Sequence, residues 1–121
     1  MKKHILIFNG VQGREKTVEV NLLDTEKAAQ VYRAINNKFR QQILKFIEEN
    51  AHVNVTTICH YLKLKQPEVS LHLAVLRKAG FVSANREGKY MLYMVNRKRM
   101  EELNRSTSIL LKQEIVRATK P

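Results

Sequence analysis

The side chains best suited to recognise a ligand lie in residues 65–82, which read KQPEVSLHLAVLRKAGFV. Val69, Leu73 and Leu76 recur at helical spacing and predict one buried stripe. The other side of this helix carries Ser70, Leu71, Ala74 and Lys78, with Arg77 beside them. A serine hydroxyl can donate to or accept from several bases. A short helix with such a face is suited to enter the major groove of DNA.

Amide and basic side chains flank this face. Gln66 precedes the expected helix, and its amide can pair with adenine; an ordinary surface glutamine is the alternative. Leu71 either packs on a thymine methyl group or is an exposed leucine without a role. Basic residues predict contacts to the DNA backbone: Lys63, Lys65 and Arg77 near the helix, and Arg86 and Lys89 at the tip of a predicted hairpin. A solvated hairpin tip is the alternative for the last two.

Other kinds of chemistry find little support in the sequence. Cys59 is the only cysteine, which excludes an internal disulfide and a multi-cysteine zinc site. Its apolar helix face predicts a buried thiol, and a redox-sensing thiol is the alternative. The histidines show no metal-ligand spacing. We expect His72, at the edge of the stripe, to pack or hydrogen-bond locally, and a contact to a DNA phosphate is the alternative. Paired carboxylates, a glycine-rich phosphate loop and a nucleophile elbow are all missing from the sequence. We therefore expect neither enzymatic activity nor a cofactor.

The charge distribution favours a polyanionic partner. The chain of 121 residues has a net charge of +11. Residues 63–99 hold nine Lys or Arg against two acidic residues, whereas residues 1–62 carry a net charge of only +3. A basic surface that serves solubility alone is the alternative. The only apolar run near the N-terminus, Ile5–Phe8, is too short for a secretory signal, and no run approaches a membrane span, so we expect a cytoplasmic protein.

The elements around residues 65–82 form a recognisable order. A helix should run from Pro67 to Lys78 and end at Gly80, because proline suits a first helical turn and glycine suits the left-handed cap. A shorter helix, residues 55–62, should precede it with Asn54 as N-cap, and residues 63–66 join the two in a helix-turn-helix pattern. The runs FVSANR and YMLYMV then predict a hairpin with its turn at residues 87–89.

Further elements are predicted at both ends. Residues 1–23 form an arm in which the alternation of Val18, Val20 and Leu22 indicates a second β-hairpin. Residues 24–121 form the main domain: Asp24 is a good N-cap for a helix over about 25–36, and a helix over about 39–50 follows. Asn96 should cap a last helix over about 97–118. The fold expected is mainly α with small β.

Three segments resemble the ArsR/SmtB family of winged helix-turn-helix bacterial repressors, over roughly residues 25–118. Residues 34–44, AINNKFRQQIL, keep Ala34, Arg40, Ile43 and Leu44 of the family pattern A-L-x-D-P-T-R-x-x-I-L. Residues 65–82 match the family's recognition segment at ten positions: Gln66, Pro67, Val69, Ser70, His72, Leu73, Leu76, Ala79, Gly80 and Val82. The wing pattern R-x-G-R-x-x-x-Y is met by Arg86, Gly88, Lys89 and Tyr93, with lysine in place of the second arginine.

The resemblance implies a homodimer that binds a pseudo-palindromic operator in double-stranded DNA, with dimer contacts from the first and last helices. The residues expected in those contacts are Val31, Ile35, Met100, Leu103, Leu110, Leu111 and Ile115. The family's E-L-C-V-C metal motif falls on His52–Thr56, where Asn54 and Thr56 stand at the cysteine positions. The last helix also has no histidine. We therefore expect no metal sensing by the usual family sites.

A DNA-binding transcriptional regulator, as a dimeric repressor, is the function that the sequence predicts. A winged helix used for protein interaction or assembly is the alternative. In that case Leu71 and Val75, one turn apart, would form an apolar contact patch.

Overall fold

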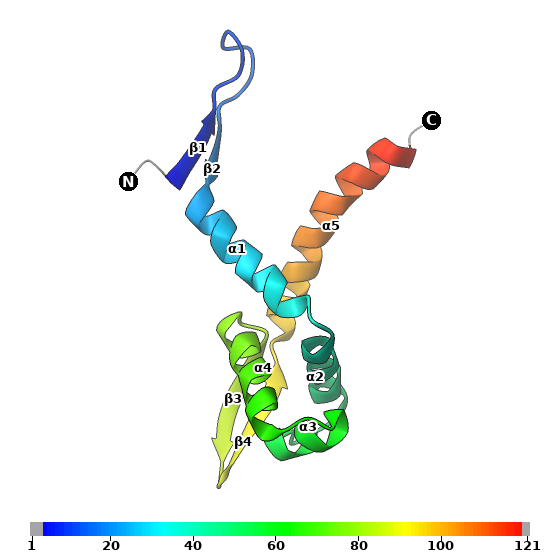
Figure 1. Cartoon of the computed structure of the whole chain (residues 1–121). Helices are drawn as coiled ribbons and strands as arrows, with labels where there is room; N and C mark the ends of the chain where they lie inside the picture. The colour runs from blue at the N-terminus through cyan, green and yellow to red at the C-terminus, as the bar shows by residue number, and fades with distance from the viewer. Residues whose placement is uncertain (1–3, 120–121) are drawn as a thin grey trace. The chain divides into compact units, whose positions relative to one another are not determined.

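The computed structural model describes residues 4–119, and side chains as far as residue 112. The chain divides into two compact units, Met1–Asn37 and Lys38–Pro121. The elements follow the order β-hairpin, four helices, β-hairpin and helix (Figure 1). The chain is therefore mainly α-helical with two small antiparallel sheets, which confirms the expected fold class.

The first unit is a hairpin that continues directly into a helix. Strands β1 (Ile5–Phe8) and β2 (Val18–Asn21) pair antiparallel, and α1 spans Leu22–Ile35. The prediction that Asp24 is the N-cap was wrong. The side-chain oxygen of Asn21 accepts from the N–H groups of Leu23 at 3.0 Å and Asp24 at 3.2 Å. Asn21 is thus both the last strand residue and the cap, and Leu22 is helical instead of extended.

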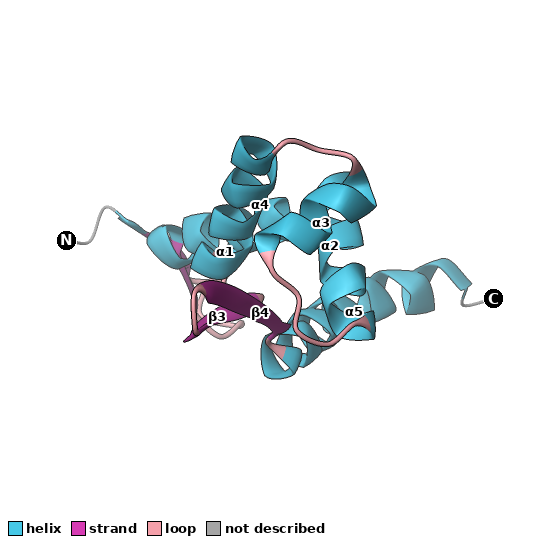
Figure 2. Ribbon diagram, turned by 90° about the horizontal axis from the view of Figure 1, so that it is seen from below, coloured by secondary structure: helices cyan, strands magenta, loops and turns pink. Residues whose placement is uncertain are grey.

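Three helices and a hairpin make up the body of the second unit. Its helices are α2 (Lys38–Glu49), α3 (Val55–Leu62) and α4 (Gln66–Lys78). Strands β3 (Val82–Glu87) and β4 (Tyr90–Val95) pair in the register Val82↔Val95 to Glu87↔Tyr90. Val53 adds an isolated bridge, because its carbonyl accepts from the N–H of Tyr93 at 2.9 Å. Figure 2 shows the three helices beside this hairpin, with a loop joining α3 to α4.

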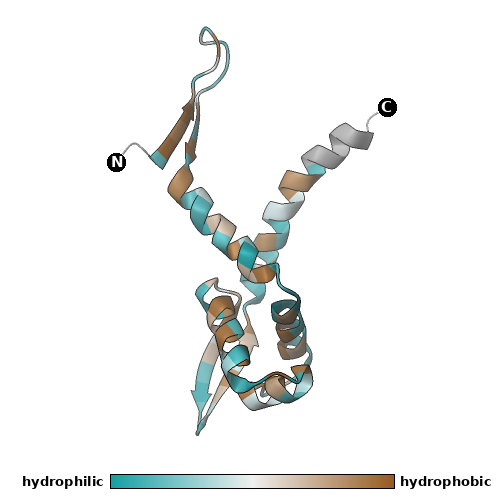
Figure 3. Ribbon diagram, viewed as in Figure 1, coloured by the Kyte–Doolittle hydropathy of each residue, from teal (hydrophilic) through white to brown (hydrophobic). Residues whose placement is uncertain are grey.

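The core of the second unit is apolar. Its buried side chains come from the three helices, from β3 and from the segments before α3 and β3: Ile43, Leu44, Ile47, Val53, Ile58, Val69, Leu73, Leu76, Phe81 and Val82. Figure 3 shows the hydrophobic residues of α2, α3 and α4 that supply most of them. The predicted stripe of Val69, Leu73 and Leu76 is therefore confirmed as core.

Asn96 connects the core to the last helix, α5 (Arg97–Thr119). Its side-chain oxygen accepts from the N–H of Arg99 at 3.2 Å, which confirms the predicted N-cap. Its side-chain amide donates to the Gly80 carbonyl at 3.0 Å, and its own N–H donates to the Phe81 carbonyl at 2.8 Å. One side chain thus fixes the start of α5 against the turn between α4 and β3.

Candidate nucleic-acid interface

Local interactions hold α3 and α4 as a helix-turn-helix. Asn54 and Thr57 form a capping box at the start of α3: the Asn54 side chain accepts from the Thr57 N–H at 3.0 Å, and the Thr57 hydroxyl accepts from the Asn54 N–H at 3.2 Å. The helix ends at Leu62, and its C-cap, Lys63, has a left-handed backbone with φ +57°. The Leu64 N–H then donates to the Cys59 carbonyl at 3.2 Å. This tight turn leads the chain into α4 within three residues.

The face of α4 opposite the core is open to solvent. Ser70, Leu71, Ala74, Arg77 and Lys78 are all exposed, and 69% of the Leu71 surface is accessible. These five side chains are small, apolar or basic, and none of them is acidic. The predicted assignment of these residues to DNA bases and phosphates stays a prediction.

The start of α4 differs from the expectation in one respect. Gln66 is the first helical residue, whereas the sequence had suggested that it precedes the helix. Lys65 is the N-cap and has an extended backbone, but no side chain caps the helix N-terminus. Lys63 and Lys65 are exposed beside this end, whereas Glu68, exposed in the first turn of the helix, carries the opposite charge.

The tip of the β3–β4 hairpin carries the remaining predicted contacts. Gly88 has φ +62°, a conformation that favours glycine, and begins the two-residue connection between Glu87 and Tyr90. Arg86 and Lys89 are exposed on either side of it, and the Lys89 ammonium lies 5.8 Å from the centre of the Tyr90 ring. The hairpin thus presents two cations at its end, as a DNA-binding wing does.

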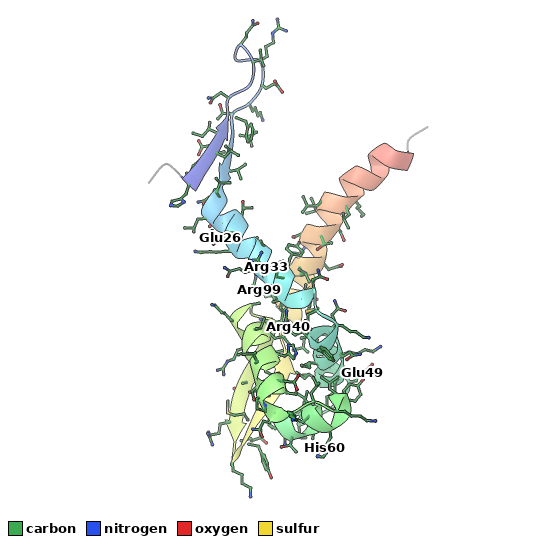
Figure 4. The ribbon with its side chains drawn as sticks, in the orientation of Figure 1. Glu26, Arg33, Arg40, Glu49, His60 and Arg99 are labelled. Carbon is green, nitrogen blue, oxygen red and sulfur yellow. The ribbon has the colours of Figure 1, made fainter. Side chains whose placement is uncertain are left out.

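Two histidines of the helix-turn-helix have contrasting environments. His72 is half-buried, and its Nδ1 lies 3.2 Å from Arg40 Nη1 on α2. Burial lowers the pKa of His72 below its ordinary value and the Arg40 charge lowers it further, whereas Glu68 raises it. The prediction of local packing or hydrogen bonding at His72 is confirmed. His60, in contrast, is exposed on α3 (Figure 4).

Sequence reasoning missed two contacts and misjudged one side chain. The Arg40–His72 contact was missed, although both residues belong to the matched family patterns. The stacked rings of Phe46 and Tyr61, 4.4 Å between centres, were also missed. Cys59 was predicted to be buried and is only partly so, because Ile58 takes the innermost position of α3.

The expected dimer-forming side chains are at least partly accessible. Val31 and Ile35 on α1 and Met100 and Leu103 on α5 are intermediate in exposure, and Leu110 and Leu111 are exposed. The side chain of Ile115 lies outside the described residues. Ile109, which the sequence analysis did not include, is exposed as well.

Two properties of the described residues bear on other functions. Among the side chains that the structure describes, residues 4–112, no three His, Cys, Asp or Glu gather in a way that could hold a metal ion. Among the helices described, none has both the length and the apolar character needed to cross a membrane.

Comparisons with known proteins agree with this geometry. Residues 37–84 match the family described as bacterial regulatory protein, arsR family. An uncharacterized HTH-type transcriptional regulator of Methanocaldococcus jannaschii is 40% identical over 78 residues, which are 64% of this chain and 88% of that protein. A probable mercury resistance operon repressor of Streptomyces lividans is 33% identical over 91 residues, 75% of this chain and 72% of that protein.

Solved structures share the fold. Reduced HlyU from Vibrio cholerae is 27% identical with a TM-score of 0.57, over 73% of this chain and 92% of that one. A homodimeric winged helix-turn-helix DNA-binding domain from Mycobacterium bovis has a TM-score of 0.60 at 21% identity, over 82% of this chain and 91% of that one. The family is one of regulators and not of enzymes. The chain therefore belongs to the ArsR family of DNA-binding transcriptional regulators, with a winged helix-turn-helix fold.

Proposed function

We propose that this protein is a homodimeric repressor that binds a pseudo-palindromic operator in the cytoplasm. The observation that carries the proposal is the two-sided character of α4. Val69, Leu73 and Leu76 are buried on one side, while the opposite side and both flanking basic regions are exposed. The name of one relative supports the sign of regulation, because the Streptomyces lividans protein is described as a probable mercury resistance operon repressor.

In this proposal the interface divides into positioning and reading contacts. Lys63, Lys65, Arg77, Arg86 and Lys89 bind phosphates, and Gln66, Ser70, Leu71, Ala74 and Lys78 face base edges. Leu71 and Ala74 have no hydrogen-bonding side chain. Affinity should therefore depend mainly on the phosphate contacts, and α4 should add a modest base preference.

A salt titration tests the phosphate contacts. Operators are first selected from random DNA, and binding is then followed by fluorescence anisotropy at increasing salt. We expect log K to fall linearly with log salt, by about 0.9 per phosphate contact. Arg77→Ala should make the slope less steep by about 1 per copy. Lys45→Ala is the matched control, because it removes an exposed positive charge from α2, outside the proposed interface. A flat plot for the wild type would contradict DNA binding of this kind.

The spacing of the half-sites tests the two-fold arrangement. Two symmetry-related α4 helices should meet half-sites about 10 bp or a multiple apart. Insertion of 5 bp between the half-sites turns one of them to the opposite side of the duplex, so affinity should fall sharply. Insertion of 10 bp returns both half-sites to the same side of the duplex, so affinity should fall much less. Equal losses for both insertions would indicate that each copy binds alone.

A homodimer is supported by the homodimeric relative of the same fold and by exposed apolar side chains on α5. In the proposed arrangement, contacts come from Val31, Ile35, Met100, Leu103, Leu110, Leu111 and Ile115. Residues 1–23 act as an arm that precedes the winged-helix domain, residues 24–121. Self-complementary contacts about a two-fold axis are the usual solution for such a dimer.

We also infer that this regulator does not sense metals at the positions of the family's E-L-C-V-C motif. Asn54 and Thr56 stand where the cysteine thiolates would be, and the Asn54 side chain is engaged in capping α3. Addition of zinc or arsenite should therefore leave operator affinity unchanged. A loss of affinity that chelation reverses would overturn this inference.

A further inference from the structure

Two motifs that are distant in sequence meet at one hydrogen bond in the second unit. Arg40 lies near the start of α2, where Figure 4 labels it, and His72 lies in the middle of α4. Arg40 Nη1 is 3.2 Å from His72 Nδ1. Phe39 lies against the same imidazole, with 5.8 Å between the ring centres and a tilt of 30°. Neighbouring residues of α2 thus hold the His72 ring by its nitrogen and by its face.

The direction of this hydrogen bond follows from the chemistry of the two groups. A guanidinium has only donors, so His72 Nδ1 must accept and cannot carry a proton. The neutral ring then carries its proton on Nε2. Protonation of Nδ1 would place a donor against a donor and a positive charge beside the Arg40 charge. The bond therefore exists only while His72 is neutral.

The charges around His72 determine when it is neutral. Partial burial lowers its pKa most, and Arg40 from α2 lowers it further. Glu68, one turn earlier on α4, raises it and so opposes both. The net effect keeps His72 neutral at pH 7, and the Arg40 bond is present under ordinary conditions.

We propose that Arg40 and His72 are positioning residues for DNA binding: Arg40 donates to neutral His72 and fixes α4 against α2, and protonation of His72 breaks this bond and weakens operator binding. The proposal rests on the proposed function, since α4 is the helix that enters the groove. The buried stripe sets how deeply α4 packs, and a polar contact at one edge of that stripe sets its rotation. Rotation matters because Ser70, Ala74 and Lys78 must face the bases together.

The direction in which affinity changes with pH distinguishes this mechanism from the effect of an added positive charge alone. A proton added near DNA should tighten binding, because it adds a positive charge close to phosphates. Release of α4 should instead weaken it. We expect operator affinity to fall as the pH decreases below about 6.5 at constant ionic strength, by about 3- to 10-fold once His72 is fully protonated, the equivalent of one lost hydrogen bond.

Three variants test the role of each atom. In His72→Asn, the amide oxygen takes the place of Nδ1 as acceptor and does not titrate, so affinity should stay near the wild-type value at pH 7.5 and be independent of pH. His72→Phe keeps the ring beside Phe39 but removes the acceptor, so affinity should be low at every pH. His60→Asn is the matched control, because His60 is an exposed histidine of the same helix-turn-helix, and this variant should keep the wild-type profile.

A measurement on the free protein keeps the proposal testable if a variant folds poorly. Long-range ¹H–¹⁵N spectra of the wild type at pH 7.5 should show His72 protonated on Nε2 only. A proton on Nδ1 would overturn the proposal, as would affinity that rises on acidification or a pH dependence that survives in His72→Asn. Absence of operator binding at pH 7.5 would instead contradict the proposed function. Binding at pH 7.5 with a flat pH profile would contradict this inference alone.

Discussion

Gly80 is the residue on which the turn from α4 into β3 depends. Its φ is +86°, a conformation that residues with a side chain adopt at a cost. Its N–H donates to the Arg77 carbonyl, and its carbonyl accepts from the side chain of Asn96, both at 3.0 Å. A Cβ at this position would lie 2.8 Å from Arg99 Nε. Both backbone strain and a side-chain neighbour therefore favour glycine here.

We expect Gly80→Ala to lower the free energy of unfolding by about 1–3 kcal/mol, from the strained conformation and the displacement of Arg99. Gly88→Ala is the matched control: its φ is +62° and a Cβ there would meet nothing within 4 Å. Urea unfolding in an Arg99→Ala background separates the two causes. In the absence of Arg99, Gly80→Ala should lower the free energy of unfolding by less than it does in the wild type, whereas the effect of Gly88→Ala should be unchanged. Equal losses in both backgrounds would show that Arg99 moves aside without cost.

The pKa of His72 has a consequence for stability as well as for binding. Because the folded state lowers this pKa, the unfolded chain takes up the proton first as the pH falls. The stabilisation is present above about pH 6.5 and is lost as the pH falls below it. Urea unfolding between pH 7.5 and 5 should show this decline in the wild type and a shallower decline in His72→Asn. A free energy of unfolding that rises on acidification would contradict the stated direction.

At the scale of elements, α4 has no side-chain cap at its N-terminus, and a proposed phosphate contact, Lys65, occupies that position. A serine side chain at this N-cap would accept from the N–H of Glu68, because Pro67 has no N–H. We expect Lys65→Ser to raise the free energy of unfolding by about 0.5–1 kcal/mol. The same change should weaken operator binding and make the salt dependence less steep by about 1 per copy. Tighter binding of the more stable variant would indicate that Lys65 contacts no phosphate.

Elements with strong local signals were predictable from the sequence. The bounds of α3 follow from Asn54 and a four-position apolar pattern, and the structure gives the same residues, Val55–Leu62. The start of α1 was missed because Asn21 and Asp24 are both good caps, and the strand register that ends at Asn21 decides between them. The Arg40–His72 contact spans 32 positions, so only the packing of α4 on α2 reveals it. Exposure of the ten predicted DNA-binding residues followed from helical periodicity and the wing turn.

The hairpin of the first unit has two unlike faces. Its register pairs Leu6 with Val20 and Phe8 with Val18 on one face, whereas Ile5 and Ile7 oppose Asn21 and Glu19 on the other. Leu6, Phe8 and Val18 are exposed on the first face, and Ile7 is exposed on the second. A two-stranded hairpin is marginally stable alone, so its apolar face needs another surface to pack against.

If a second copy of the chain supplies that surface, the double variant Leu6→Ser, Phe8→Ser should raise the dimer dissociation constant in sedimentation equilibrium. The control, Ile5→Ser with Ile7→Ser, should raise it less, and equal effects would exclude a face-specific contact.

At the scale of the whole molecule, stability and assembly should be linked. A folded state that dimerises is stabilised by mass action, so its thermal midpoint depends on protein concentration. Leu110 on α5 is the side chain best suited to test this, because 66% of its surface is accessible and its replacement leaves the described core intact. Leu110→Lys places a charge where the proposed dimer needs an apolar contact. Asn104→Lys adds the same charge at an exposed polar position of the same helix.

We expect the wild-type midpoint to rise as the protein concentration increases from about 1 to 100 µM, and Leu110→Lys to abolish most of this rise. Asn104→Lys should leave it unchanged. Loss of the dimer should also reduce operator affinity far more than the loss of any single phosphate contact, because two α4 helices no longer bind as one unit. A concentration-independent midpoint in the wild type, together with monomer mass at 100 µM, would contradict the homodimer. Tight operator binding by a monomeric Leu110→Lys would show instead that each winged helix recognises its half-site alone.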